Sequence, residues 1–336
     1  MVSGPKETIL LEHGSGGQAS QKLLEEIFFP AFSEVRPLDS ALLELPEGGR
    51  LAFTTDTFVV EPIFFPGGDL GSLAVHGTVN DLAMVGAKPL YLSVAFILEE
   101  GLSYDVLRRL VHSLAQAAEK AGVHIVCGDT KVVPKGKGDK IFINTSGVGV
   151  VEEGLKLQPE RIKPKDKIII SGPIAEHGLA VLASREELGL EGLRSDSQAV
   201  HEPALALCRA LQAKLHALRD PTRGGLASTL NELAQSAGHC FVLEEAAIPL
   251  RPEVEAGCEI LGLDPLYLAC EGRFVAFVAP EAVEDALSIL AHYPSSAQAA
   301  VIGEVVRGEP KVWLKTRVGG TRLVPSLSGE PLPRIC

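Results

Sequence analysis

Residues 51–98 read LAFTTDTFVVEPIFFPGGDLGSLAVHGTVNDLAMVGAKPLYLSVAFIL, a stretch in which apolar runs of strand type enclose one run of helical type. Leu51–Thr57, Val59–Phe65 and Tyr91–Leu98 are short and apolar, which predicts strands. Leu70–Gly86 has its apolar residues at helical spacing and predicts a helix that ends at its final glycine. Together they predict a layer of helices packed on a sheet.

Outside this stretch, both halves of the chain contain further helices and strands. Helices are expected at 18–29, 103–121, 177–188, 199–211, 225–237 and 282–291. Strands are expected at 123–127, 141–151, 167–171, 267–269, 274–278, 301–306 and 312–314. Because the two kinds do not alternate regularly, the expected fold class is α/β (α+β), built as sandwiches and not as a Rossmann fold.

The length of 336 residues and a change of composition near residue 152 predict two domains. The segment 152–165 is polar and contains two prolines, so we place the boundary there. From residue 324 the chain has three prolines, a glycine and no periodicity, which predicts an extended tail. The expected parts are a glycine-rich segment with a helix (1–35), an N-terminal domain (36–155), a C-terminal domain (156–323) and a mobile tail (324–336).

Composition limits the class of protein. The net charge is −12 and is spread along the chain, which argues against nucleic acid or anionic lipid as partners. No signal peptide and no run long enough to cross a membrane is present. The six cysteines are scattered without CxxC spacing, as expected for reduced thiols in the cytoplasm.

Four aspartates stand beside small hydroxyl, amide or glycine residues near the ends of apolar runs. They are Asp56, Asp81 (after Asn80), Asp129 and Asp220. Carboxylate oxygens in such places suit Mg²⁺, which also binds waters and substrate phosphates. Each one, taken singly, is better explained as a helix cap or a turn former. Asp81 fits that explanation least, because it falls inside an apolar helix where an unpaired carboxylate is costly.

Several residues are candidates for phosphate binding, although the chain contains no GxxxxGK[ST] motif. Gly14-Ser15-Gly16-Gly17 precedes a predicted helix, where backbone N–H groups can approach phosphate, or it is only a flexible turn. Lys131 follows Asp129-Thr130 directly after a predicted strand, and Arg223 precedes the glycines that begin a helix. Both cations are equally consistent with solvated surface positions.

Glu271, in Cys270-Glu271-Gly272, lies between two predicted strands. A partly desolvated carboxylate has a raised pKa and suits proton transfer, while a β-bulge or an edge position is the alternative.

Cys336 is the last residue, so it lacks the three following residues of a prenylation motif. A free thiol on a mobile tail invites oxidation and is a good nucleophile. The tail is therefore interpreted as an arm that presents a sulfur-bound group.

These segments together resemble the HypE family of hydrogenase maturation factors, of the ATP-binding superfamily that includes aminoimidazole ribonucleotide synthetase and selenophosphate synthetase. The resemblance rests on HGSGG (13–17), TTDT (54–57), HGTVNDLAMVGAKP (76–89), GDTK (128–131), RDPTRGGL (219–226) and the ending PRIC (333–336). The ending is the most specific mark, and the other motifs are shared across the superfamily.

The resemblance implies a two-domain aminoimidazole ribonucleotide synthetase-like fold, a homodimer joined through the N-terminal sheets, and ATP with Mg²⁺ as cofactors. The residues implied for ATP are Gly14, Ser15, Gly16, Gly17, Asp56, Asn80, Asp81, Asp129, Asp220 and Arg223, and the four aspartates are the implied Mg²⁺ ligands. It further implies ATP-dependent dehydration of a carbamoyl group on Cys336 to a thiocyanate, which supplies cyanide ligands to NiFe hydrogenase iron. Glu271 is the candidate base, and Lys131 is the candidate group that positions the carbamoyl group. The implied partners are the carbamoyltransferase HypF and the HypC–HypD complex.

Two other functions stay open from the sequence. One is a small-molecule ATP-dependent phosphotransferase or ligase of the same superfamily, although it leaves Cys336 without a task. The other is a nucleotide-binding scaffold whose terminal cysteine is metal-bound or redox-active.

Overall fold

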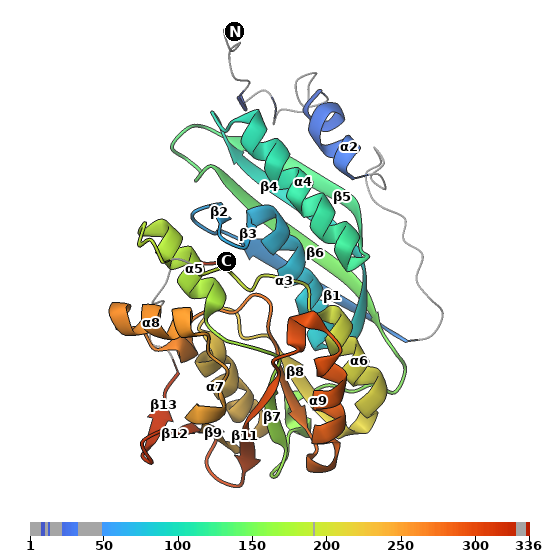
Figure 1. Cartoon of the computed structure of the whole chain (residues 1–336). Coiled ribbons are helices and arrows are strands. Elements are labelled where there is room, and N and C mark those ends of the chain that lie inside the picture. Colours follow the sequence, from blue (N-terminus) through green and yellow to red (C-terminus); the bar gives the residue numbers. More distant parts are fainter. Residues whose placement is uncertain (1–7, 11–12, 14–21, 33–48, 191, 327–333) are drawn as a thin grey trace.

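The computed structural model describes residues 8–10, 13, 22–32, 49–190, 192–326 and 334–336. It contains two sheets with helices packed on them, and the C-terminus lies between the two layered regions (Figure 1). This arrangement confirms the expected α/β class. Among the described residues, no helix is long and apolar enough to cross a membrane.

The first sheet has four strands in the order β1-β6-β4-β5. Its strands are β1 (Arg50–Phe58), β4 (Ala87–Glu99), β5 (His124–Val133) and β6 (Ile141–Val151). Only the β4–β5 pair is parallel. Helices α3 (Leu70–Met84) and α4 (Tyr104–Ala121) pack on one face, and a small ribbon of β2 (Phe64–Phe65) and β3 (Gly68–Asp69) precedes α3 (Figure 1). The short α2 (Phe29–Ala31) continues a π-helical turn at Leu24–Phe28 and packs near α4.

Helix α3 begins and sits where it does for identifiable local reasons. Asp69 caps its N-terminus by accepting from the Ser72 backbone N–H, and the Ser72 hydroxyl receives the Asp69 N–H in return. A Cβ at Gly71 would lie 2.3 Å from the Leu110 carbonyl oxygen, so this glycine permits close approach of α3 to α4. The helix is buried nearly all round, and Asp81 on it is half-buried.

The two faces of this sheet differ in what covers them. Along β6 every second residue is buried, and the buried side faces α3 and α4. No described helix covers the other side, which we call the outer face. On it, Leu51 and Phe53 are 60% and 68% exposed. A second layer of protein is therefore needed to bury this apolar surface.

The second sheet has seven strands in the order β13-β12-β9-β11-β7-β10-β8. The strands are β7 (Lys167–Ile170), β8 (Leu215–Arg219), β9 (Cys240–Glu244), β10 (Val275–Val278), β11 (Ala300–Val306), β12 (Val312–Lys315) and β13 (Thr321–Val324). The helices are α5 (Glu176–Arg185), α6 (His201–Leu211), α7 (Gly225–Ala237), α8 (Pro252–Leu261) and α9 (Val283–Ala291). Side chains alternate between the faces: Ile169 packs with α6 and α9, while Ile168 and Ile170 pack with α7 and α8.

Several local predictions differ from the structure. The segment 267–269 is not a strand, because Pro265–Tyr267 forms a 3₁₀ turn. Of Val59–Phe65 only the last two residues are in a strand. Strand β5 does not end at residue 127 but continues to Val133, so Lys131 lies within it. The sequence also gave no prediction of β8, β9, β13 or α8. The predicted helix at 18–29 is described from residue 22 only.

Candidate active site

The docked tail, residues Arg334–Cys336, lies between the two domains and is held by polar contacts. The Arg334 carbonyl accepts from the backbone N–H of Glu61 (3.1 Å) and from the guanidinium of Arg185 (2.7 Å). The Arg334 guanidinium pairs with the carboxylates of Glu61 and Asp139. Ile335 is buried in the N-terminal core. The last three residues are therefore docked inward, while the mobility of the tail 324–336 stays a prediction.

His177 on α5 fixes the last peptide group of the tail. Its Nε2 lies 2.8 Å from the Ile335 carbonyl oxygen, and its Nδ1 lies 2.7 Å from the Ser195 hydroxyl. Since a carbonyl can only accept, Nε2 carries the proton and Nδ1 accepts from Ser195. Burial lowers the pKa of His177 to about 4, so the ring is neutral at physiological pH.

The tail places the Cys336 thiol beside the carboxyl group of Glu271. Burial raises the pKa of Glu271 well above its usual range, and the neighbouring Asp220, Asp196 and Asp56 raise it further. Glu271 Oε1 is buried and has no hydrogen-bond partner among the described residues. Burial and then the Glu271 carboxyl raise the pKa of the Cys336 thiol. Glu271 is thus a desolvated, unusually basic carboxylate that faces the terminal sulfur, as proton transfer requires.

Three of the four predicted aspartates form one electrostatic group at the inner edge of the first sheet. Asp56 comes from β1, Asp81 from α3 and Asp220 from the segment that follows β8. Burial, together with the charge of Asp56, raises the pKa of Asp81 to about 6. Burial and then the charge of Asp81 raise the pKa of Asp220 to about 7. A bound cation would offset the repulsion between these carboxylates.

A cavity of about 500 Å³ opens beside these carboxylates. Its lining includes Thr54, Asp56, Asp81, Asp220 and Arg223. The N-terminus of α7 follows directly, at Gly225, and its N–H groups favour a bound phosphate. Among the described residues no three His, Cys, Asp or Glu side chains are placed to ligate one ion together. Fewer carboxylates suit Mg²⁺, which keeps waters and phosphate oxygens as its other ligands.

Asp129 and Lys131 lie elsewhere in this chain. In β5 they pair with Ala95 and Ile97 of β4, so both side chains are on the outer face. Asp56 faces the helices and stands at the opposite edge of the sheet, three strand spacings or roughly 14 Å away. Asp129 and Lys131 pair with each other at 3.4 Å and are mostly exposed. The structure of one chain therefore does not bring them to Cys336.

The remaining predicted residues have different outcomes. The Asn80 amide donates to the carbonyls of Gln198 (3.0 Å) and Glu271 (3.3 Å) and accepts from the Val200 N–H (2.8 Å). In this structure Asn80 thus holds the protein chain, and its role toward nucleotide stays a prediction. Gly14, Ser15, Gly16 and Gly17 lie outside the described residues.

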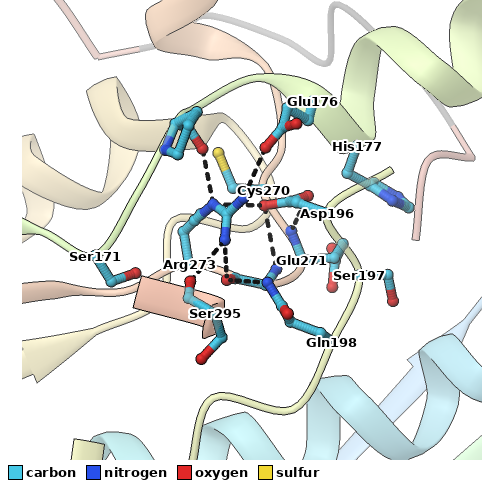
Figure 2. Close-up of polar contacts among 12 residues, drawn as sticks. Ser171, Glu176, His177, Asp196, Ser197, Gln198, Cys270, Glu271, Arg273 and Ser295 are labelled. Atoms are coloured by element: carbon cyan, nitrogen blue, oxygen red, sulfur yellow. Dashed lines mark hydrogen bonds and ion pairs between the residues drawn. The ribbon is translucent and has the colours of Figure 1, made fainter. Parts of the chain in front are cut away.

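A buried ionic network supports the segment that carries Glu271 (Figure 2). Arg273 donates to Glu176 (2.7 Å) and lies 3.6 Å from Asp196. Asp196 in turn accepts from the backbone N–H groups of Glu271 (3.1 Å) and Gly272 (3.3 Å). No motif or short spacing connects the residues of this network, or His177, Arg185 and Glu61, so they could not be identified from the sequence.

Two family models match the chain. The N-terminal domain of AIR synthase related proteins matches residues 38–151, and the C-terminal domain of the same proteins matches residues 163–315. The carbamoyl dehydratase HypE of Cupriavidus necator is 50% identical over 329 residues, which cover 96% of this chain and 93% of that relative.

Two solved structures are also similar over nearly the whole chain. The hydrogenase maturation protein HypE in complex with ATP has a TM-score of 0.93 and 46% identity, covering 98% of this chain and 100% of that chain. A chain of the HypE–HypF complex has a TM-score of 0.80 and 42% identity, covering 93% of this chain and 100% of that chain. Sequence and fold thus agree with the resemblance found from the motifs.

Proposed function

Because the chain belongs to the HypE family of carbamoyl dehydratases, within the AIR synthase related proteins, we propose that it dehydrates a carbamoyl group carried on its own terminal thiol. The product is a thiocyanate on Cys336, a source of cyanide ligands for the iron of NiFe hydrogenase. One observation carries this proposal: the thiol of the last residue is docked against Glu271, a buried carboxylate whose pKa is raised well above its usual range.

The overall reaction converts Cys336–S–C(=O)NH₂ and ATP into Cys336–S–C≡N, ADP and phosphate, with release of one proton. The carbamoyl nitrogen must lose its two protons, and the carbon must lose the carbamoyl oxygen. ATP, the co-substrate, supplies phosphorylation of the carbamoyl oxygen, which turns that oxygen into a leaving group. The chain itself must then remove the nitrogen protons and keep water away from the activated group.

Glu271 is the proposed base. Its unpartnered Oε1 is available to accept a nitrogen proton from the carbamoyl group on the adjacent sulfur. A carboxylate with a raised pKa binds that proton more strongly than an exposed glutamate does, which favours the transfer. The contacts of Arg334 and Ile335 place the sulfur beside Glu271, and we propose that the docked tail also limits the access of water to the activated group.

We propose that a magnesium ion binds at this group together with the nucleotide, held by one or two of Asp56, Asp81 and Asp220 and by waters and phosphate oxygens. Burial is the main cause of their raised pKa values, and charge repulsion raises those of Asp81 and Asp220 further, so full ionisation of this group is costly. A bound Mg²⁺ offsets that charge and the charge of the phosphates. Arg223, which lowers the pKa of both Asp56 and Cys336, is the proposed cationic neighbour of the phosphate.

Lys131 and Asp129 enter the proposal through a second copy of the chain. The exposed Leu51 and Phe53 on the outer face favour a homodimer joined through this face. We propose that the pairing brings the β5 edge of one copy to the β1 edge of the other. Lys131 of a second copy then positions the carbamoyl group on Cys336 of the first, and Asp129 supports its nucleotide site.

Mixed dimers test this arrangement. Lys131→Ala and Cys336→Ala are each expected to be inactive alone, while their mixture regains roughly a quarter of wild-type activity, since only hybrid dimers hold one intact site. A mixture that stays inactive, with exchange of subunits shown by native mass spectrometry, contradicts the shared site.

We propose the carbamoyltransferase HypF as the donor of the carbamoyl group, in line with the solved HypE–HypF complex of relatives. The HypC–HypD complex is the proposed acceptor of cyanide, and the cytoplasm the proposed location.

Intact-protein mass spectrometry tests the proposal as a whole. After incubation with the carbamoyltransferase, carbamoyl phosphate and ATP, an adduct on Cys336 is expected that loses one water when ATP is consumed. Cys336→Ala abolishes the adduct, whereas Cys127→Ala, at the other half-exposed cysteine, keeps it. Wild-type protein that binds ATP but carries no adduct on Cys336, with the transferase shown active, overturns the proposal. The remaining functions would then be a small-molecule ATP-dependent enzyme or a nucleotide-binding scaffold.

A further inference from the structure

The segment Ser195–Gln198 touches both groups that the proposed reaction must bring together. Asp196 accepts from the backbone N–H of Glu271, so it holds the base from behind. Ser195 donates to His177, which in turn donates to the Ile335 carbonyl, so it holds the tail. These contacts come from adjacent residues of one short segment.

Asp196 and the segment that carries Glu271 are fixed relative to each other by two hydrogen bonds and a close backbone approach. Both carboxylate oxygens of Asp196 are used, one by the N–H of Glu271 and the other by the N–H of Gly272. A Cβ at Gly272 would lie 1.8 Å from the Asp196 carbonyl oxygen, so the two backbones touch. Gln198 adds a longer contact to the Gly272 carbonyl, at 3.4 Å.

The charge of Asp196 is balanced within the protein. Arg273 lies between Asp196 and Glu176 (Figure 2), and it also donates to the carbonyls of Pro173 (2.8 Å) and Ser295 (3.0 Å). The guanidinium is buried and is held on several sides. Asp196 is consequently fixed in place as an acceptor of backbone N–H groups and has no free oxygen for a ligand.

The hydrogen bonds that connect the segment to the tail each have a fixed donor and acceptor. The Ser197 N–H donates to the Ser195 hydroxyl at 3.0 Å, and that hydroxyl donates to His177 Nδ1. Because each group has one role, the chain of bonds permits only the His177 tautomer that donates to the tail. The segment is also tied to the N-terminal domain, through the Ser195 N–H to the Pro66 carbonyl at 2.8 Å.

We infer that Ser195–Gln198 is a positioning segment, in which Asp196 sets the place of Glu271 and Ser195, through His177, sets the place of the tail that bears Cys336. The inference rests on the proposed function, since it assigns residues to the same dehydration. Neither Asp196 nor Ser195 is a catalytic residue, because both act through other groups.

Asp196→Asn tests the base side, because it keeps the shape of the side chain but leaves one backbone N–H without its acceptor. Wild-type and variant protein are loaded by the carbamoyltransferase, and conversion of the adduct is followed in a single turnover by mass spectrometry. Loading and ATP affinity are expected to stay unchanged, while conversion slows roughly 10- to 100-fold, the usual effect of a misplaced catalytic group. Asp166→Asn is the matched control, since Asp166 is equally buried but pairs with His216 in the C-terminal domain.

The pH profile separates positioning from general damage. Asp196, Asp220, Asp56 and Cys336 are the titratable groups that act on Glu271, and Asp196 raises its pKa by charge repulsion. Removing that charge lowers the pKa of Glu271, so the acid limb of the conversion rate moves to lower pH in Asp196→Asn. A rate that falls equally at every pH, with a falling ATP affinity, shows a structural role only and overturns the inference. An unchanged rate with an unchanged limb overturns it as well.

Ser195→Ala tests the tail side and does not depend on the dehydration. Losing the bond to His177 loosens the docked tail, so alkylation of Cys336 by iodoacetamide, mapped on peptides, is expected to become several-fold faster. Alkylation at the wild-type rate contradicts the tail half of the inference. If Asp196→Asn does not fold, the alkylation assay still tests the tail half of the inference. Wild-type protein that is loaded but never converts the adduct contradicts the proposed function. The alkylation rates still test the tail contacts in that case.

Discussion

Two groups of buried and half-buried carboxylates in this molecule differ in how their charge is balanced. Glu176 and Asp196 share the buried cation Arg273, and Glu176 also pairs with Arg251. Asp56, Asp81 and Asp220 form no ion pair with any described residue. The first group thus carries a contacting counterion within the chain, while the second has only the more distant charges of Arg219 and Arg223.

The difference teaches which group serves the fold and which serves a ligand. A balanced cluster has its oxygens occupied and its charge neutralised, so it stabilises one arrangement of the backbone. An unbalanced cluster makes the protein without ligand less stable and is relieved by a cation, which is the property expected of a binding site. The comparison predicts opposite signs for similar substitutions in the two groups.

Arg273→Met is expected to have the largest effect on stability. It leaves Glu176 and Asp196 buried without their shared cation, and breaking a buried ionic group in this way costs about 3–5 kcal/mol. Urea unfolding measures the loss, with the exposed Arg209→Met as control. A loss below about 1 kcal/mol contradicts the idea that Arg273 balances this group.

Asp220→Asn is expected to act in the opposite direction on stability. Removing one of the repelling carboxylates stabilises the protein without ligand by up to about 4 kcal/mol at pH 8, judged from a pKa of about 7. The same change should lower ATP turnover by carbamoyl-loaded protein about 100-fold, because the cation loses a ligand. A variant that is less stable than wild type at pH 8 breaks the comparison.

The stability of the protein without ligand should also depend on pH through this cluster. Asp81 and Asp220 have raised pKa values in the folded state, about 6 and about 7, so the folded protein binds more protons than the unfolded chain. Their contribution is therefore present at low pH and is lost as pH rises through those values. The buried His76 and His177, with pKa values of about 4, act in the opposite direction below their usual titration range.

The difference between wild type and Asp220→Asn cancels the histidine contribution. From pH 5 to pH 8 this difference should change by about 2–3 kcal/mol in favour of the variant. Saturating Mg²⁺ with a non-hydrolysable ATP analogue should reduce the change, as measured by thermal unfolding across the same range. A difference that is constant with pH shows that the cluster is already neutralised.

Arg251→Ala is expected to have the smallest effect. Arg251 pairs with Glu176 at 2.6 Å, but its side chain is 48% exposed and Arg273 remains in place. Exposed ion pairs contribute about 0–1 kcal/mol, so urea unfolding should detect little change. A loss as large as that of Arg273→Met would mean that the two arginines balance Glu176 equally.

The aspartates of the unbalanced group could be predicted from the sequence, and the residues of the balanced group could not. Asp81 interrupts an apolar helix, a local conflict that marks an unusual residue, and Asp220 lies in a recognisable motif. Glu176, Asp196 and Arg273 have no common motif and are 20 and 77 residues apart along the chain. Only the folded backbone brings them together.

Strand β5 shows a second limit of sequence reasoning. Its pairing with β4 shifts between Ile125 and Cys127, which leaves Val126 as an extra residue. The shift moves Asp129 and Lys131 to the outer face, although simple alternation from the buried Ile125 places them on the inner face. A bulge of this kind has no dependable local signature, so the expected meeting of all four aspartates could not be tested from the sequence alone.

The way the tail is held has a consequence for the chemical states that it can carry. Its anchors engage the carbonyl and guanidinium of Arg334 and the carbonyl of Ile335, and none of these is an atom of Cys336. The contacts that hold the tail thus do not depend on which group the Cys336 sulfur carries. The free thiol, its carbamoyl form and its cyano form can follow one another at this position without any of these anchoring bonds being broken.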